Sequence, residues 1–264
     1  MADLKNVMHI VIGTDRNLDY ILNREIIRYN FPNGLDLWLT TVYNGNMNNI
    51  ASGCGENTFI RLEENNGYAY GALDSINEGL EFAKNAHRDI VVVTNFDGFF
   101  FSQTKYENLI DSFIESGRPF AAGLHQSHEF PMSDLMIFKK EFLKEILPIL
   151  PEVNGERKKN EFLQKEYKGT ELGFDNVEEW VFNALTKVGN PDDLWWKFER
   201  DGHPRYRWTE KWAFGHLHEE DMKREKISNY KTIKGHNIAK YMGIKIKHQE
   251  IEEIRRPDGT SFSV

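Results

Sequence analysis

The sequence has few of the features that mark secreted, membrane-spanning or nucleic-acid-binding proteins. It contains a single cysteine, Cys54, which excludes an internal disulfide and is compatible with a reducing compartment. No segment approaches the ~18 consecutive apolar residues of a membrane span, and residues 1–6 carry no apolar core with a cleavage signal. The formal net charge of -8 argues against general nucleic-acid binding, which requires a cationic face. These absences predict a soluble, cytoplasmic protein.

The most informative stretch that is present runs from Asp89 to Thr94 and ends in Asn95-Phe96-Asp97-Gly98. Its run of β-branched apolar residues is typical of a strand that is buried on both faces of a parallel sheet. A carboxylate at the carboxyl end of such a strand lies where open α/β sheets bind their ligands. Asp97 is therefore the first candidate site residue.

The first hundred residues alternate strand and helix patterns, with polar or glycine-rich turns between them. The expected strands span 7–14, 35–42, 58–63 and 89–94, and the expected helices span 18–29 and 70–85. This β-α-β-β-α-β order predicts an α/β fold with a parallel core, a layout typical of nucleotide-binding proteins. The second half is less regular. Its expected helices span 106–116, 139–147 and 176–187, and its expected strands span 120–124 and 134–138.

Asp97 can act through a divalent cation. Hard cations such as Mg²⁺ bind carboxylate oxygens together with water and phosphate oxygens, so Asp97 suits the cation of a diphosphate and Asn95 suits a ribose hydroxyl. The alternative is that Asp97 only caps the turn before Gly98. A haloacid-dehalogenase type of phosphatase is excluded, because that chemistry needs a nucleophilic carboxylate where Asn95 stands.

Four motifs in order resemble the nucleotide-binding half of glycosyltransferases with the GT-A fold, closest to the family-2-like group. They are Gly13-Thr14-Asp15, Val42-Tyr43-Asn44-Gly45, Asn65 to Gly71 (NNGYAYG), and Asn95-Phe96-Asp97. Tyr43 replaces the acid that commonly reads the base and is expected to stack on it instead, and Asn95 replaces the first Asp of the stricter motif. The resemblance implies a mostly parallel central sheet flanked by helices, a C-terminal extension, and Mn²⁺ or Mg²⁺ as cofactor. The donor-binding residues that it implies are Gly13, Thr14, Asp15, Arg16, Tyr43, Asn44, Asn66, Gly67, Gly71, Asn95 and Asp97.

A second cluster of carboxylates, Asp175, Glu178 and Glu179, stands at the expected start of the helix over 176–187. Acidic residues at a helix N-terminus are stabilised by the macrodipole, which explains them without catalysis. In the inverting enzymes of the resembled group, an acid at such a helix start is the general base for the acceptor hydroxyl. The resemblance makes Asp175, Glu178 or Glu179 the candidate base and does not choose among them.

The third cluster is His216-Leu217-His218, whose two imidazoles would share one face of a strand. In the resembled group, a histidine near the end of the catalytic domain often adds a ligand to the metal or diphosphate. His216 or His218, with His218 slightly preferred, is therefore expected to join Asp97. The alternative is an ordinary exposed loop histidine.

The acceptor is expected to lie in the second half. Sugars pack their C–H faces on aromatic rings, and the neighbours Trp195 and Trp196 cannot both face inward on a strand, so at least one is a candidate platform. His125, His128 and Asp134 follow or begin predicted strands and are further candidates for acceptor binding.

The function implied by the resemblance is a metal-dependent glycosyltransferase, a hexosyl- or pentosyltransferase of carbohydrate biosynthesis. It would use a nucleoside-diphosphate sugar donor and a glycan or glycolipid acceptor, with inversion at the anomeric carbon. The alternatives are a binding protein that has lost turnover and a sugar-phosphate nucleotidyltransferase, which is disfavoured because the turn after the first strand has only one glycine.

The expected domains are a catalytic domain over 1–220, with a donor half over 1–100 and an acceptor half over 101–220, and a basic extension over 221–264. Between Lys223 and Lys247 the extension has eight Lys or Arg and one acid. It would steer a diphosphate, contact an anionic membrane surface or mediate homo-oligomerisation.

Overall fold

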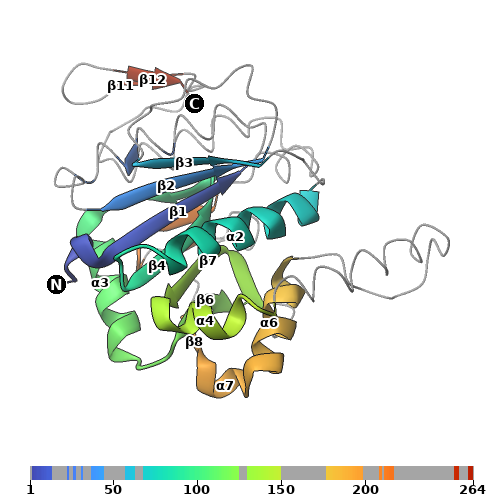
Figure 1. Cartoon of the computed structure of the whole chain (residues 1–264). Helices are drawn as coiled ribbons and strands as arrows, with labels where there is room; N and C mark the ends of the chain where they lie inside the picture. The colour runs from blue at the N-terminus through green and yellow to red at the C-terminus, as the bar shows by residue number, and fades with distance from the viewer. Residues whose placement is uncertain are drawn as a thin grey trace, which may run out of the picture.

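The fold is built on a seven-stranded sheet with the order β3-β2-β1-β4-β7-β6-β8. In a computed structural model of the chain, the residues described are 2–13, 23, 26–27, 31, 37–44, 57–62, 68–124, 130–149, 177–198, 208–209, 211–216, 253–255 and 261–263. The strands of the sheet are β1 (Val7–Gly13), β2 (Trp38–Tyr43), β3 (Thr58–Arg61), β4 (Ile90–Asn95), β6 (Phe120–Leu124), β7 (Pro131–Lys139) and β8 (Trp195–Phe198). Only β7 runs antiparallel to its neighbours β4 and β6. The predicted mostly parallel sheet is therefore confirmed (Figure 1).

The central strands β1 and β4 are buried on both faces, as their apolar sequences predict. Met8, Ile10, Val91 and Val93 belong to one core cluster, whereas Val7, Val11 and Val92 belong to the other. This division follows the alternation of side chains along a strand.

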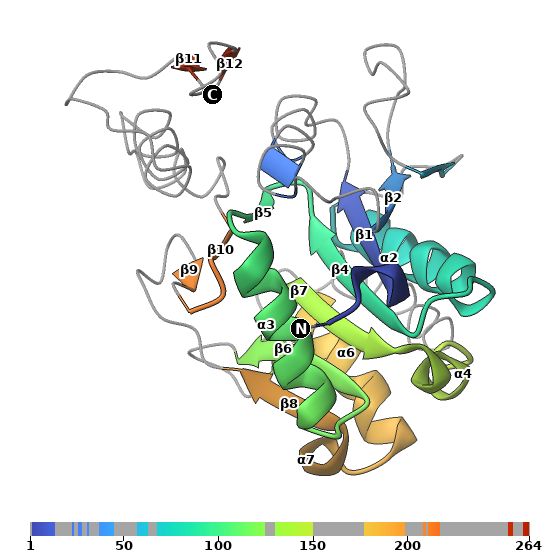
Figure 2. The same cartoon turned by 90° about the vertical axis from the view of Figure 1, so that its left-hand side faces the viewer.

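Helices cover both faces of the sheet (Figures 1 and 2). On one face lie α2 (Tyr68–Lys84), α4 (Leu143–Ile146) and α6 (Val177–Val188), and on the other lies α3 (Gln103–Glu115). Gly79 allows α2 to approach the sheet closely, since a Cβ at this position would lie 2.9 Å from Cγ2 of Ile10. Two short 3-10 turns, η1 (Leu4–Asn6) and η3 (Lys140–Phe142), precede β1 and α4.

Several boundaries differ from the sequence-based prediction for identifiable reasons. Helix α3 begins three residues earlier than expected, because the Ser102 hydroxyl caps it by accepting from the backbone N–H of Lys105 at 3.3 Å. The expected helix over 139–147 is interrupted, because Lys139 still belongs to β7 and the Lys140 N–H donates to the Asp89 carbonyl. Within the predicted helix over 18–29, the three described residues at 23, 26 and 27 are helical.

A small second sheet, which the sequence did not predict, lies beside the end of β4. It consists of β5 (Gly98–Phe100), β10 (Phe214–His216) and β9 (Trp208–Thr209) in the order β5-β10-β9, and all its pairs are antiparallel. The turn into β10 uses Ala213 at a positive φ of 48°, an uncommon conformation for a residue with a Cβ. A separate hairpin pairs β11 (Glu253–Arg255) with β12 (Ser261–Ser263).

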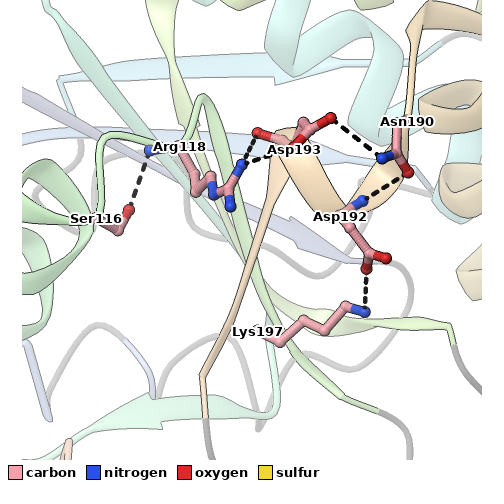
Figure 3. Close-up of polar contacts among 6 residues, drawn as sticks. All are labelled: Ser116, Arg118, Asn190, Asp192, Asp193 and Lys197. Carbon is pink, nitrogen blue, oxygen red and sulfur yellow. Dashed lines mark hydrogen bonds and ion pairs between the residues drawn. The ribbon is translucent and has the colours of Figure 1, made fainter.

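A cluster of polar surface residues connects the segments that precede β6 and β8 (Figure 3). The Arg118 guanidinium donates to the Asp193 carbonyl at 2.5 Å and lies 3.5 Å from its carboxylate, which ties α7 (Pro191–Leu194) to the turn before β6. A hydrogen bond from Lys197 at 2.8 Å lowers the pKa of the Asp192 carboxyl. These groups are largely exposed, so each pair contributes little stability.

Among the described residues, none of the helices has both the length and the apolar composition needed to cross a membrane.

Candidate functional site

The carboxyl ends of three parallel strands meet at one edge of the main sheet. Gly13 at the end of β1 is in register with Tyr43 on β2, and Ile12 is in register with Asn95 on β4. The backbone N–H of Asn44 also donates to the Gly13 carbonyl at 2.9 Å. The structure thus brings together four of the expected donor-binding positions, at the edge where open α/β sheets bind ligands.

Asp97 lies in the tight turn between β4 and β5, and the second sheet brings His216 to it. Antiparallel pairing of β10 with β5 places His216 opposite Gly98, one residue after Asp97. His216 Nε2 is 2.9 Å from Asp97 Oδ1, although the residues are 119 positions apart in sequence. Asp97 is 3% exposed and His216 is 4% exposed. The two expected metal-binding positions that the structure describes are therefore in direct contact.

Backbone and side-chain hydrogen bonds fix the turn that carries Asp97. The N–H of Phe96 donates to the Ile12 carbonyl at 2.9 Å. The Asn23 amide donates to the carbonyl of Gly98 at 2.6 Å and to that of Phe96 at 3.3 Å, and so holds the turn on both sides of Asp97. Asn23 was missed by the sequence analysis, because one polar residue in a helical pattern carries no signal of a contact 75 residues away.

Asp134 lies on the opposite side of the His216 imidazole from Asp97. Its Oδ2 is 3.6 Å from His216 Nδ1, and the side chain is 2% exposed. The pairing of β6 with β7 shifts between Ala122 and Leu124, so β7 has extra residues at this point. Such irregularities redirect side chains near functional sites. The structure thus places Asp134, expected to bind the acceptor, beside the pair expected to bind metal.

The start of α6 reaches the same region through Ser133. The Ser133 hydroxyl donates to Glu178 Oε1 at 2.7 Å, across 45 residues of sequence. Glu178 and Glu179 are both half-buried in the first turn of α6. Ser133 precedes Asp134 on β7, so the residue that contacts Glu178 and the residue that faces His216 are neighbours in sequence.

The Asp97–His216 pair fits a divalent cation that keeps part of its own coordination shell. A carboxylate oxygen and an imidazole nitrogen are ligands that manganese and related ions accept. In the described part of the chain, no three His, Cys, Asp or Glu side chains form a group that could hold a metal. The pair suits an ion that completes its shell with water and phosphate oxygens.

Two amides stand near the pair at the carboxyl ends of the strands. Asn95 is half-buried at the end of β4. Asn44 is only 2% exposed, and neither its amide nitrogen nor its amide oxygen has a hydrogen-bond partner within the described residues. An unsatisfied buried amide costs stability, so the Asn44 side chain is a polar group suited to a ligand. Gly71 is buried in the first turns of α2, where its carbonyl accepts from the Ser75 hydroxyl at 2.6 Å.

The expected stacking of Tyr43 on a nucleotide base is wrong. The Tyr43 ring is fully buried and lies between Phe59 and Phe96, with centroid distances of 6.1 and 6.2 Å. Phe96 in turn covers Gly13, where a Cβ would lie 2.2 Å from its ring. Tyr43 therefore points into the core below the strand ends, and the residue that follows it, Asn44, is the polar one.

Of the two tryptophans expected to offer an acceptor platform, Trp195 is buried and Trp196 is half-buried. Trp195 is 3% exposed in one core cluster, and its indole N–H donates to the Ala122 carbonyl at 3.1 Å. Trp196 packs on the other face of β8 against Phe113 and Trp212. The register can be followed across the sheet from Trp196 on β8 to Ala121 on β6, Ile137 on β7 and Val92 on β4. Both tryptophans therefore lie level with the first half of β4, away from its carboxyl end. Val92 lies five residues before Asp97, which corresponds to roughly 16 Å along an extended chain.

The remaining expected site residues, Thr14, Asp15, Arg16, Asn66, Gly67, His125, His128, Asp175 and His218, lie outside the described residues. The slight preference for His218 over His216 is therefore untested.

No protein-family model matches the chain, and no curated protein matches it. Among solved structures, the chain is similar to the mannosyltransferase PcManGT from Pyrobaculum calidifontis, in complex with GDP-Man and Mn²⁺, with a TM-score of 0.45 and 12% identity. The match covers 74% of this chain and 55% of that one, so this chain corresponds to about half of the mannosyltransferase. It is also similar to a protein from Desulfovibrio desulfuricans G20 that is provisionally named a nucleotide-diphospho-sugar transferase. There the TM-score is 0.43, the identity is 11%, and the match covers 74% of this chain and 80% of that one. The chain has the predicted α/β fold, with a mostly parallel central sheet flanked by helices.

Proposed function

We propose that this protein is a metal-dependent glycosyltransferase that moves a sugar from a nucleoside diphosphate to a glycan or lipid-linked acceptor, with inversion of the anomeric centre. The observation that carries the proposal is the buried contact between Asp97 and His216 at the carboxyl edge of the sheet. These side chains come from two sequence motifs 119 positions apart, both expected from the sequence to contribute to one metal site. The division into a catalytic domain over 1–220 and a basic extension over 221–264 is part of the same proposal.

Asp97 and His216 would hold Mn²⁺ or Mg²⁺ through a carboxylate oxygen and an imidazole nitrogen. When bound, the cation supplies positive charge that neutralises the diphosphate and makes it a better leaving group. Asn23 keeps the Asp97 turn in place through its two carbonyl contacts. A preorganised turn of this kind avoids reorganisation during the reaction.

Asn44 and Asn95 supply the neutral polar contacts of the proposed donor site. The Asn44 amide offers one donor group and one acceptor atom, both without partners in the described structure. It therefore suits a nucleoside, whose base edges and ribose hydroxyls need both kinds of partner. Asn95, half-buried at the end of β4, is assigned to a ribose hydroxyl.

Glu178 is the proposed general base. It is hydrogen-bonded to Ser133, whose neighbour Asp134 lies against His216, and this contact favours Glu178 over Glu179. Glu178 would take the proton of the acceptor hydroxyl as that oxygen attacks the anomeric carbon. The bond from the anomeric carbon to the diphosphate breaks in the same step, and its electron pair leaves with the nucleoside diphosphate.

The experiment that tests this function combines thermal shift with donor hydrolysis. The full chain is heated with UDP, GDP or dTDP, with and without Mn²⁺. A ligand present at about 100 times its Kd stabilises the folded state by about 2.7 kcal/mol, which is a rise of roughly 5–10 °C in Tm for a chain of this size. The sugar nucleotides of any stabilising diphosphate are then tested for Mn²⁺-dependent hydrolysis.

Asp97→Ala is expected to abolish both the Mn²⁺-dependent shift and the hydrolysis. Asp89→Asn is the matched control, because Asp89 is exposed at the opposite end of β4. The proposal fails if no nucleoside diphosphate raises Tm in the presence of Mn²⁺, or if Asp97→Ala hydrolyses the donor at the wild-type rate. Binding without any hydrolysis or transfer would instead favour a binding protein that has lost turnover.

A further inference from the structure

Asp134 is a buried carboxylate to which the proposed reaction assigns no step. It is 2% exposed on β7, and its Oδ2 lies 3.6 Å from Nδ1 of His216. Burying a carboxylate is costly unless it has a charged or hydrogen-bonding partner. His216 is one group that lies against the buried Asp134 carboxylate.

The fold brings Asp134 to this imidazole through β7, the antiparallel strand of the seven-stranded sheet. β7 runs beside β4, with Leu135 in register with Thr94, so Asp134 comes level with the end of β4. The shift of register between β6 and β7 falls at the same point. Carboxylates from the β4–β5 turn and from β7 thus flank a histidine from β10.

The two carboxylates approach different nitrogens of the ring. Asp97 Oδ1 is 2.9 Å from Nε2, whereas Asp134 Oδ2 is 3.6 Å from Nδ1. The separation of 3.6 Å exceeds the 2.7–3.2 Å of an N–H···O hydrogen bond, so the Asp134 carboxylate lies beside Nδ1 at slightly more than hydrogen-bond distance. Because Asp134 lies at Nδ1 and Asp97 lies at Nε2, Asp134 is placed as a partner of the histidine on the side of the ring away from Asp97.

We propose that Asp134 is a positioning residue that orients His216 for metal binding. A histidine that binds a metal through one nitrogen usually donates the N–H of its other nitrogen to a carboxylate or carbonyl, which fixes the tautomer and the ring orientation. Asp134 would keep the proton of His216 on Nδ1 and leave the Nε2 lone pair facing Asp97. The inference rests on the proposed function, since it takes Asp97 and His216 as the metal-binding pair.

The test measures Mn²⁺ binding to the full chain by electron paramagnetic resonance, with pulsed detection of the ¹⁴N coupling from His216. Asp134→Ala is expected to raise the Kd for Mn²⁺ by about 10- to 100-fold, the range found for such outer partners, and to weaken the ¹⁴N coupling. Asp134→Asn keeps an acceptor oxygen without the charge and is expected to fall between wild type and Asp134→Ala. Because Asp134→Asn preserves size and shape, it gives a result even if Asp134→Ala folds poorly.

Three reference variants define the outcomes. Asp97→Ala should lose Mn²⁺ binding, His216→Gln should lose the ¹⁴N signal, and Asp89→Asn should match wild type. The inference is overturned if Asp134→Ala binds Mn²⁺ with the wild-type Kd and ¹⁴N coupling. It is also overturned if Asp134→Asn loses binding as completely as Asp97→Ala, because Asp134 would then be a direct ligand. If wild type itself binds no Mn²⁺, with or without a nucleoside diphosphate, the metal site of the proposed function fails as well.

Discussion

Replacing Glu178 by Gln should reduce sugar transfer far more than the same change at its neighbour Glu179. Both residues are half-buried in the first turn of α6. Glu178 accepts a hydrogen bond from Ser133 at 2.7 Å, and Ser133 precedes the residue that faces His216. Glu178→Gln keeps the shape of the side chain but removes its ability to take a proton.

The expected magnitude follows from the role of a general base. Such a group contributes about 10²- to 10⁴-fold in rate, which is about 2.7–5.5 kcal/mol at 1.36 kcal/mol per tenfold change. Ser133→Ala removes a hydrogen bond to a charged group, for which about 1.5–3 kcal/mol is typical. Solvent screening at this half-buried position lowers that figure, so we expect Ser133→Ala to reduce kcat by roughly tenfold.

Glu179→Gln is the matched control for helix stability. Each exchange removes one negative charge from the N-terminus of α6, which costs about 0.3–1 kcal/mol of stability in either variant. The measurement is kcat for transfer at saturating donor and Mn²⁺, together with Tm and the Kd for Mn²⁺. The Kd for Mn²⁺ should be nearly unchanged in Glu178→Gln. If Glu179→Gln lowers kcat as much as Glu178→Gln or more, the assignment of the base is wrong.

Two further predictions concern the core beneath the site. Tyr106 is fully buried, and its hydroxyl has no hydrogen-bond partner in the described part of the chain. Tyr106→Phe should therefore raise the free energy of unfolding, measured with urea, by about 1–3 kcal/mol. A loss of stability in this variant would contradict the prediction. Burial raises the pKa of Tyr106 well above its ordinary value. The contribution of the neutral phenol to the free energy of unfolding is therefore complete below about pH 10 and is lost as the pH rises through the raised pKa of the folded state. Wild type should therefore lose stability above pH 10 more steeply than Tyr106→Phe. Gly13→Ala would place a Cβ 2.2 Å from the Phe96 ring. This overpacking should lower the free energy of unfolding by about 1–3 kcal/mol and should therefore lower Tm. An unchanged Tm would mean that the ring moves without strain.

The strands of the first half could be predicted because their burial is encoded locally. β4 was expected over 89–94 and spans Ile90–Asn95, since a run of β-branched residues is suited to burial on both faces of a sheet. The expected strand over 120–124 is also confirmed as β6. The second sheet could not be predicted in this way, because strands of two or three residues are too short to show a period. The pairing that places His216 at Asp97 depends on contacts distant in sequence.

The errors at the site share one physical cause, which is that residue type does not specify the direction of a side chain. Tyr43 was expected to face a nucleotide, but it is followed by a polar residue and turns into the core between Phe59 and Phe96. Trp195 and Trp196 were both candidates for a sugar platform, but Trp195 is buried in a core cluster. The expected role of Asp134 in acceptor binding stays a prediction. The neighbour of Asp134 in the structure is decided by the antiparallel course of β7.

The contact between Asp97 and His216 also changes how the expected halves of the catalytic domain relate to each other. A donor site confined to residues 1–100 would lack the imidazole, which enters through β10, and the carboxylate beside it, which enters through β7. Joining residues 119 positions apart costs little more entropy than a shorter closure, because each doubling of loop length adds only about 0.6 kcal/mol. β5 and β10 contribute three backbone pairs, and Phe100 and Phe214 pack with centroids 4.9 Å apart. The small sheet is therefore the element that completes the proposed metal site. We expect metal binding to be lost when the pairing of β5 with β10 is disrupted.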